Sequence, residues 1–275
     1  MRCRVSAMAL VYALVGLLGL PAALAAPNPA KLQLQSSSAL VMDVGTGKTL
    51  YQKNATRVRP IASITKLMTA LVVLDARQDL GQTLTIDQND RDAIKHTYSR
   101  VRMGTQVSRR DALHLALMSS ENRMASALAR HYPGGRPAFV RAMNNKAKQL
   151  GMRNSRFYDS TGLSTRNVST AQDLAKLIAA AYRQPLIREF TQDTSKDMRF
   201  RTPAYSLMFN NTNPLVKNPD WDVRLSKTGF TDEAGRCLLM RAKPDNRELA
   251  IVLLNSVGKR TPVGDANRIR KWLKS

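Results

Sequence analysis

Cysteine and histidine are scarce in this sequence of 275 residues, which has two of the first and three of the second. Cys3 lies in the N-terminal segment that we expect to be removed as a signal peptide, so Cys237 has no partner for an internal disulfide in the rest of the chain. The three histidines, His96, His114 and His131, form no cluster with the spacing of metal ligands. We therefore expect no metal site and no cofactor, and a serine–histidine pair has little support.

The N-terminal apolar run, Ala7–Leu20, is short for a helix that spans a membrane. Arg2 and Arg4 precede it, and residues 23–25 (Ala-Leu-Ala) place small side chains at the two positions that a signal peptidase reads. We predict that residues 1–25 are a cleaved signal peptide, and the alternative is an uncleaved membrane anchor. In either case the rest of the chain works outside the cytoplasm.

Negative charge is also in short supply, with 20 acidic residues against 43 lysines and arginines and a formal net charge of +23. Removal of residues 1–25 takes away Arg2 and Arg4 but no acid, which leaves +21. Such a charge favours an anionic partner. Nucleic acid is not expected, because the chain carries an export signal and no zinc-finger or RNP-type signature. Peripheral association with an anionic cell envelope fits better, and a basic surface that only aids solubility is the alternative.

The composition, 43% hydrophobic and 23% charged, is that of a globular chain that can bury a sizeable core. Residues 26–38 are predicted to be a polar, poorly ordered lead-in, and residues 39–54 a hairpin that turns at Gly45–Lys48. Residues 61–74 are apolar on nearly every side, which is typical of a buried helix. Further helices are predicted after the N-cap Ser108, at residues 124–131 and at residues 170–182.

The last sixty residues change character and contain three strand-like runs, "VRLSKTGF", "CLLMRAK" and "ELAIVLLNSV". A short helix is expected at residues 267–273. Strands at both ends of the chain with helices between them predict an α+β fold, in which one antiparallel sheet is flanked by helices. No linker divides the chain, so we expect a single domain over residues 39–275.

Ser63 and Lys66 lie three residues apart in the apolar segment "PIASITKLMTA", and so on one face of a helix. Serine needs an adjacent base to act as a nucleophile, and lysine can serve only if its pKa falls well below its usual value of about 10.4. Burial in an apolar helix lowers that pKa. Ser256 and Lys259 have the same spacing, but they lie where a strand ends in a glycine-containing turn. Such a turn does not hold the serine and the lysine on one face, as a helix would.

Two other short motifs could complete such a site. Ser120 and Asn122 lie at a break between helical segments, where a loop can present both side chains inward. Lys227, Thr228 and Gly229 lie on a strand of the terminal sheet. There a lysine could bind a substrate carboxylate, and a glycine could leave room for a substrate backbone. Taken alone, the first motif is better explained as an ordinary polar interruption, and the second as a basic strand end.

Ser-x-x-Lys, Ser-x-Asn and Lys-Thr-Gly in this order resemble the motif set of the penicillin-recognising serine acyl-transfer enzymes. "ASITKLMTA", "LMSSENRMASALA", "HYPGG", "YDSTGLS", "NVSTAQDL" and "KTGFT" resemble more narrowly the low-molecular-mass D-alanyl-D-alanine peptidases, and above all their periplasmic endopeptidase branch. The resemblance covers essentially residues 36–273. It implies the β-lactamase/DD-peptidase-like transpeptidase fold, a mainly antiparallel five-stranded sheet between helical layers.

The resemblance also implies a role for each matching residue. Ser63 would be the acylated nucleophile and Lys66 its proton acceptor. Ser120 would relay a proton, and Asn122 would hold the substrate amide. Which of Lys66 and Ser120 activates the water for deacylation stays open.

Three residues of the third motif and their neighbour complete the implied site. Lys227 and Thr228 would bind the substrate carboxylate beside Gly229. The backbone N–H groups of Ser63 and Phe230 would form the oxyanion hole. Only 46 residues follow Gly229, so we expect neither the second β domain nor the amphipathic anchor of some family members.

A class A β-lactamase shares the three motifs but also uses a glutamate from an E-x-x-L-N stretch between the second and third motifs. The chain has four glutamates, Glu121, Glu189, Glu233 and Glu248. Only Glu189 lies in that interval, and its surroundings, "REFTQD", do not match. We therefore expect a long-lived penicilloyl adduct on Ser63 rather than efficient hydrolysis of the antibiotic.

The resemblance implies a periplasmic DD-endopeptidase that cuts D-alanyl–diaminopimelate cross-links of peptidoglycan and is inhibited by penicillins. A DD-carboxypeptidase, which removes the terminal D-alanine of a pentapeptide stem, is the nearest alternative. A non-catalytic module that binds the envelope through its charge is a third.

Overall fold

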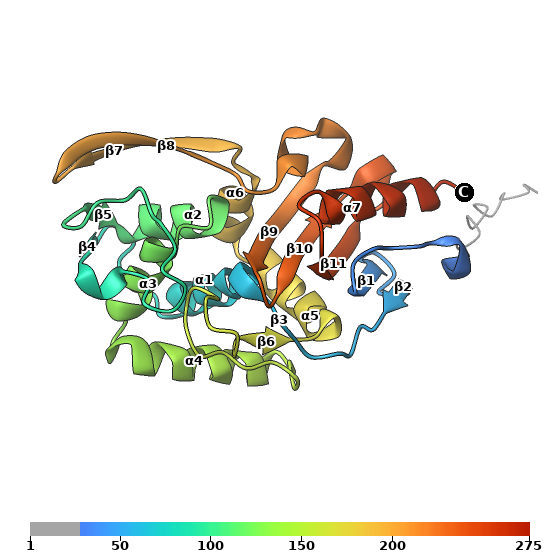
Figure 1. Ribbon diagram of the computed structural model, residues 1–275, viewed down its shortest axis with the longest axis horizontal. Helices are drawn as coiled ribbons and strands as arrows, with labels where there is room; N and C mark the ends of the chain where they lie inside the picture. The colour runs from blue at the N-terminus through green and yellow to red at the C-terminus, as the bar shows by residue number, and fades with distance from the viewer. Residues whose placement is uncertain (1–27) are drawn as a thin grey trace, which may run out of the picture.

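A five-stranded antiparallel sheet lies at the centre of the computed structural model, with strand order β2-β1-β11-β10-β9 (Figure 1). The structure describes residues 28–275, so the predicted signal peptide lies outside the described residues. Both ends of the described chain contribute to the sheet, which confirms the predicted α+β fold. The strands are β1 (Ser38–Asp43), β2 (Thr49–Lys53), β9 (Val223–Thr231), β10 (Gly235–Ala242) and β11 (Leu249–Ser256).

Helices cover both faces of the sheet because both faces are apolar. Alternate residues of β11 point to opposite sides, as the pleat of a strand requires. Val252 and Leu254 join the large core on the side of α5 (Ala171–Tyr182), whereas Ile251 and Leu253 join the smaller core under α7 (Thr261–Trp272).

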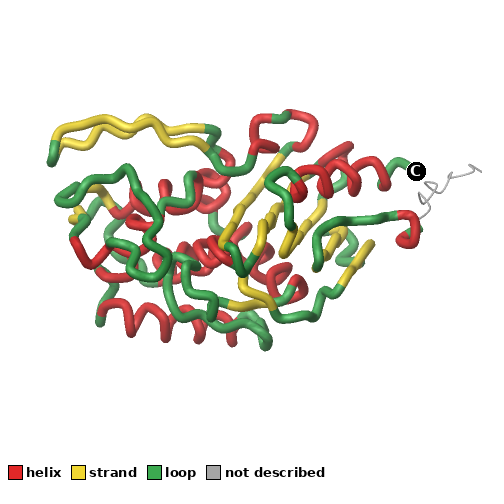
Figure 2. The backbone as a smooth tube through the Cα atoms, viewed as in Figure 1, coloured by secondary structure: helices red, strands yellow, loops and turns green. Residues whose placement is uncertain are grey.

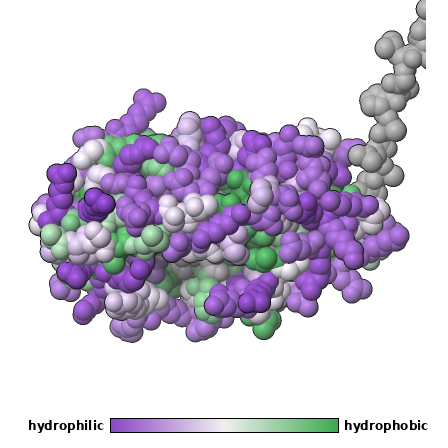
Figure 3. Space-filling view, turned by 90° about the horizontal axis from the view of Figure 1, so that it is seen from above, coloured by the Kyte–Doolittle hydropathy of each residue, from purple (hydrophilic) through white to green (hydrophobic). Residues whose placement is uncertain are grey.

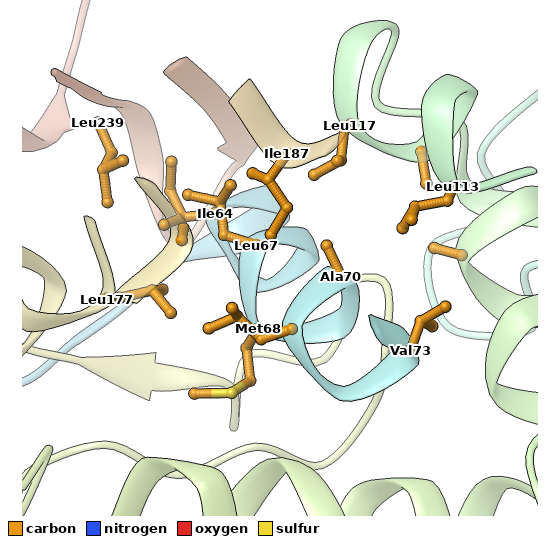
Figure 4. Packing of buried hydrophobic residues seen from close by; sticks show 14 of the residues in the cluster. Ile64, Leu67, Met68, Ala70, Val73, Leu113, Leu117, Leu177, Ile187 and Leu239 are labelled. Atoms are coloured by element: carbon orange, nitrogen blue, oxygen red, sulfur yellow. The ribbon is translucent and has the colours of Figure 1, made fainter. Parts of the chain in front are cut away.

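A helical lobe built around α1 lies beside the sheet (Figure 1). Residues 65–73 of α1 are all buried, as its apolar sequence predicts. Figure 4 shows Leu67 and Ala70 of α1 on the side of that helix that faces Leu117 of α2 and Ile187 of α6. The helices of the lobe are α1 (Thr65–Asp75), α2 (Arg109–Met118), α3 (Asn122–Arg130), α4 (Gly135–Gln149) and α6 (Pro185–Gln192).

Short two-stranded sheets and 3-10 turns connect these parts (Figure 2). The paired strands are β3 (Arg59–Pro60) with β6 (Val168–Ser169), β4 (Thr83–Thr85) with β5 (Gln106–Ser108), and β7 (Ser195–Arg201) with β8 (Ala204–Asn210). The 3-10 turns are Pro29–Lys31, Ala62–Ile64, Gln88–Asp90, Pro214–Lys217, Pro219–Trp221 and Pro244–Asn246.

Two helices begin elsewhere than predicted. The segment predicted as a helix over residues 61–74 opens with the 3-10 turn Ala62–Ile64, and α1 begins only at Thr65. The terminal helix begins at Thr261 rather than Asn267, because Pro262 fits the first helical turn, where no N–H donor is needed.

The expected poorly ordered lead-in differs from the structure over residues 28–37. Leu32 and Leu34 are buried in the core under α7. The Asp265 carboxylate accepts hydrogen bonds from the backbone N–H of Ser36 at 2.7 Å and from its hydroxyl at 2.6 Å. The alternation of leucine with polar residues therefore marks an extended segment with one buried side.

The face of the molecule seen from above is largely hydrophilic (Figure 3). Among the helices of residues 28–275, none is both long enough and apolar enough to cross a membrane.

Asp265→Ala should lower the free energy of unfolding by about 2–4 kcal/mol, because it leaves the backbone N–H of Ser36 without an acceptor and removes one partner of the buried Ser36 hydroxyl. Urea denaturation measures the change. Asp245→Ala is the matched control: Asp245 pairs with Arg270 on the surface, and its loss should cost less than about 1 kcal/mol. Equal effects of the two substitutions would contradict the account of the lead-in.

Candidate active site

Ser63 lies in the tight 3-10 turn between β3 and α1. Ala62 just before it has φ of 45°, in the left-handed region that costs an alanine about 1 kcal/mol. Two glycines allow neighbouring segments to pack closely against this turn, because they have no Cβ. A Cβ on Gly162 would lie 2.0 Å from the carbonyl oxygen of Ala62, and a Cβ on Gly229 would lie 3.0 Å from the backbone nitrogen of Ser63. Close packing on two sides therefore fixes the backbone of Ser63.

Lys66 is buried on the first turn of α1, and its Nζ lies 2.7 Å from Ser63 Oγ. The same nitrogen lies 2.7 Å from Asn122 Oδ1 and 2.7 Å from the carbonyl oxygen of Thr161. A neutral amine has two N–H donors and one lone pair. The two oxygen acceptors match the donors, and the lone pair is left to accept the Ser63 hydroxyl proton.

Burial lowers the pKa of Lys66 from 10.5 to about 7. The negative charges of Asp159, Glu121 and Asp92 oppose this shift. A pKa near 7 leaves much of Lys66 neutral at neutral pH, which is the state that a general base requires. Burial also lowers the pKa of Lys227 well below its usual value, with the charge of Lys66 as a second cause.

The second motif turns at the break between α2 and α3. Ser120 has φ of 63°, so the chain reverses there and both Ser120 and Asn122 line the cavity at Ser63. Asn122 accepts a hydrogen bond from Lys66 and donates one to Thr97 Oγ1 at 3.1 Å.

The third motif lies on β9, at one edge of the sheet. Thr228, Gly229 and Phe230 line the cavity, whereas Lys227 is buried behind it and donates to the carbonyl of Thr228 at 3.0 Å. Gly229 also makes room for the turn that carries Ser63, since a Cβ there would lie 3.0 Å from the backbone nitrogen of Ser63.

One cavity of about 800 Å³ joins the three motifs, since Ser63, Ser120, Asn122 and Thr228 all line it. Lys66 does not line the cavity, but it contacts Ser63 and Asn122, which do. No aspartate or glutamate of the described chain lines this cavity. Within residues 28–275 no group of three His, Cys, Asp or Glu side chains could hold a metal ion.

The loop of residues 91–100 contributes contacts that sequence patterns did not indicate. Thr97 bonds Asn122, and Lys95 forms an ion pair with Glu233 in the turn between β9 and β10. The loop therefore links the helical lobe to the sheet. Thr161 also had no expected role, although "YDSTGLS" contains it.

The second Ser-x-x-Lys copy does not form a site. Ser256 is buried and its hydroxyl lies 2.8 Å from that of Ser36, while Lys259 is exposed. The turn that follows β11 separates the two side chains, as expected from its glycine.

Comparison with known proteins places this geometry in a family. The family model for D-alanyl-D-alanine carboxypeptidases, peptidase S11, matches residues 23–258. The chain belongs to the S11 peptidase family. It is 51% identical to a D-alanyl-D-alanine endopeptidase of Pseudomonas aeruginosa over 90% of this chain and 80% of that one. Its identity to the Escherichia coli protein of the same name is 49%, over 91% of this chain and 81% of that one.

Two solved structures have a fold similar to that of this chain. The DD-transpeptidase of Streptomyces K15 superposes with a TM-score of 0.81 at 27% identity, over 88% of this chain and 98% of that one. Penicillin-binding protein D2 of Listeria monocytogenes in its ampicillin-bound form has a TM-score of 0.74 at 28% identity, over 89% and 99%. The DD-peptidase fold expected of this S11 peptidase is confirmed.

The rate of acylation by benzylpenicillin should rise with pH around a midpoint near 7, because protonated Lys66 cannot accept the Ser63 proton and neutral Lys66 can. Glu121→Gln removes a negative charge that stabilises protonated Lys66, so it should move the midpoint to lower pH. Glu248→Gln, just before β11 and away from the cavity, should leave the midpoint in place. Stopped-flow acylation rates measure this. A midpoint that moves upward in Glu121→Gln would contradict the assignment.

Gly229→Ala should slow acylation by about 100-fold, because the added methyl group displaces the backbone of Ser63. Gly45→Ala, where the methyl group would meet its nearest neighbour at an ordinary 3.5 Å, is the control and should keep the wild-type rate. Thermal unfolding of both variants shows whether the fold is intact. A wild-type acylation rate in Gly229→Ala would show that the close approach is unnecessary.

Proposed function

We propose that this protein is a serine DD-endopeptidase that hydrolyses D-alanyl–diaminopimelate cross-links of peptidoglycan through an acyl-enzyme on Ser63. One observation carries the proposal: a buried lysine with a pKa of about 7 lies 2.7 Å from a serine hydroxyl. The names of relatives that are about half identical to the chain support endopeptidase action in particular.

Acylation begins when Lys66 Nζ accepts the Ser63 hydroxyl proton and Ser63 Oγ attacks the D-alanyl carbonyl carbon. The N–H groups of Ser63 and Phe230 donate to the oxyanion of the tetrahedral intermediate. The intermediate collapses as the C–N bond breaks. The proton returns from Lys66, through Ser120, to the departing amine.

An extended substrate fits along β9, since β9 is an edge strand whose outer side lines the cavity. Asn122 holds the substrate amide, and the Thr228 hydroxyl binds the carboxylate beside the scissile bond. Lys227 supports that carboxylate from behind. An anion bound at Thr228 would favour the protonated form of Lys227.

Deacylation adds water to the ester carbonyl and releases Ser63. Lys66, neutral again once the amine has left, accepts the proton of the water. A penicillin acylates Ser63 in the same way, but its ring nitrogen stays tethered and hinders the water. Because no glutamate lines the cavity and Glu189 pairs with Arg110 instead, the penicilloyl ester is long-lived.

The predicted signal peptide supports a periplasmic location for the mature chain, where cross-linked peptidoglycan is found. The charge of +23 over the full sequence suits peripheral contact with this anionic envelope. DD-carboxypeptidase action is the second candidate, because the matched family bears that name. A non-catalytic module is disfavoured, since it gives no reason for a buried lysine at a serine hydroxyl.

Purified protein should convert cross-linked muropeptide dimers to monomers, and Ser63→Ala should reduce that rate by about 10³-fold or more. Chromatography of the digest measures monomer, and an assay of free D-alanine separates carboxypeptidase from endopeptidase action. Ser256→Ala, in the second Ser-x-x-Lys copy, is the matched control and should retain activity. Equal rates for Ser63→Ala and the wild type would sink the proposal, as would free D-alanine with no monomer.

A further inference from the structure

The cavity at Ser63 continues past Phe230 toward the start of α7, farther than a single D-alanine leaving group requires. We call this extension the distal arm; its cations are Arg236, Lys259 and Arg260. Its other walls include Pro262, Val263 and Asn267 of α7. The arm and the reactive serine share one continuous space, so a ligand bound at Ser63 can extend into the arm.

The three cations of the distal arm have no anionic partner. Among residues 28–275, none of them forms an ion pair, although sixteen ion pairs occur elsewhere in that part of the chain. No carboxylate lines the cavity either. Three like charges around one space repel one another, and an anionic ligand would relieve that repulsion.

Arg236 is held in position for such a ligand. It lies on β10 directly opposite Phe230 on β9, and its guanidinium carbon is 4.1 Å from the centre of the Phe230 ring. The cation–π contact orients the planar group but uses none of its N–H donors. Those donors remain available to a carboxylate, which guanidinium groups bind in a bidentate manner.

We propose that the distal arm binds a second carboxylate of the leaving peptide, the free C-terminal carboxylate of the stem that departs when a cross-link is cut. The proposal rests on the proposed function and deepens it. A single D-alanine carries only the carboxylate beside the scissile bond, which binds at Thr228. A departing stem carries another carboxylate farther along, and the arm lies in that direction. The arm is thus a device that favours cross-links over terminal D-alanine.

Two synthetic cross-linked dimers test the proposal, identical except that the leaving stem ends in a carboxylate in one and in an amide in the other. The wild type should cut the carboxylate dimer with a kcat/KM about five- to tenfold higher. Lys259→Gln/Arg260→Gln should reduce that preference to less than about twofold. Arg236→Met, which keeps an apolar stem over the Phe230 ring, should also reduce it. In the wild type the preference should shrink as salt is added.

Lys31→Gln/Lys271→Gln is the matched control, because it removes two exposed positive charges at another part of the surface. It should keep the wild-type preference. A wild type that cuts both dimers equally well overturns the distal arm while the proposed function stands. The distal arm is also overturned if the control loses as much of the preference as Lys259→Gln/Arg260→Gln does, since a general effect of the protein's charge would then explain the preference. Failure to cut either dimer overturns the proposed function and the arm together.

Discussion

The site depends on an uncharged amine held against a serine hydroxyl. Removing Lys66 from water disfavours its ammonium form, and its three neighbours suit a neutral amine with two donors and one lone pair. Nearby carboxylates act in the opposite direction and keep its pKa from falling further. Burial and those charges together bring the pKa close to neutral pH, where a base is most useful.

The rest of the fold supplies the conditions for that contact. α1 is buried by α2, α3 and α4 of the helical lobe and by α5, so its first turn carries Lys66 into an apolar environment. The strained turn at Ala62 aims Ser63 at the cavity, and glycines at two neighbouring segments allow the close packing that holds the strain. The edge strand β9 then offers a substrate its free side beside the nucleophile. Sheet and lobe meet at the site, so neither part could form it alone.

The sequence predicted the sheet and α1 because both leave strong local patterns: a continuous apolar run in β11, and apolar residues on nearly every side of α1. It also pointed to the residues that now lie around one cavity, through three motifs in a familiar order. The sequence could not assign roles to Gly162 and Thr161. Gly162 packs closely against Ala62, and the Thr161 carbonyl accepts a hydrogen bond from Lys66. Both contacts join residues about a hundred positions apart, so they leave no local signal in the sequence. The burial of Leu32 and Leu34 was missed because their partner, α7, lies at the other end of the chain. The cations of the distal arm were missed for the same reason, since a turn and a strand distant in sequence bring them together.

The central claim is that Lys66 is largely neutral near pH 7 in the folded protein. Carbon-13 NMR of the lysine ε-methylene groups tests it most directly, with Lys66→Ala used to assign the signal and the shift followed across pH. The account predicts a titration with a midpoint near 7. A midpoint close to the usual value of about 10.4 would show that Lys66 is an ammonium group at neutral pH and would contradict the account.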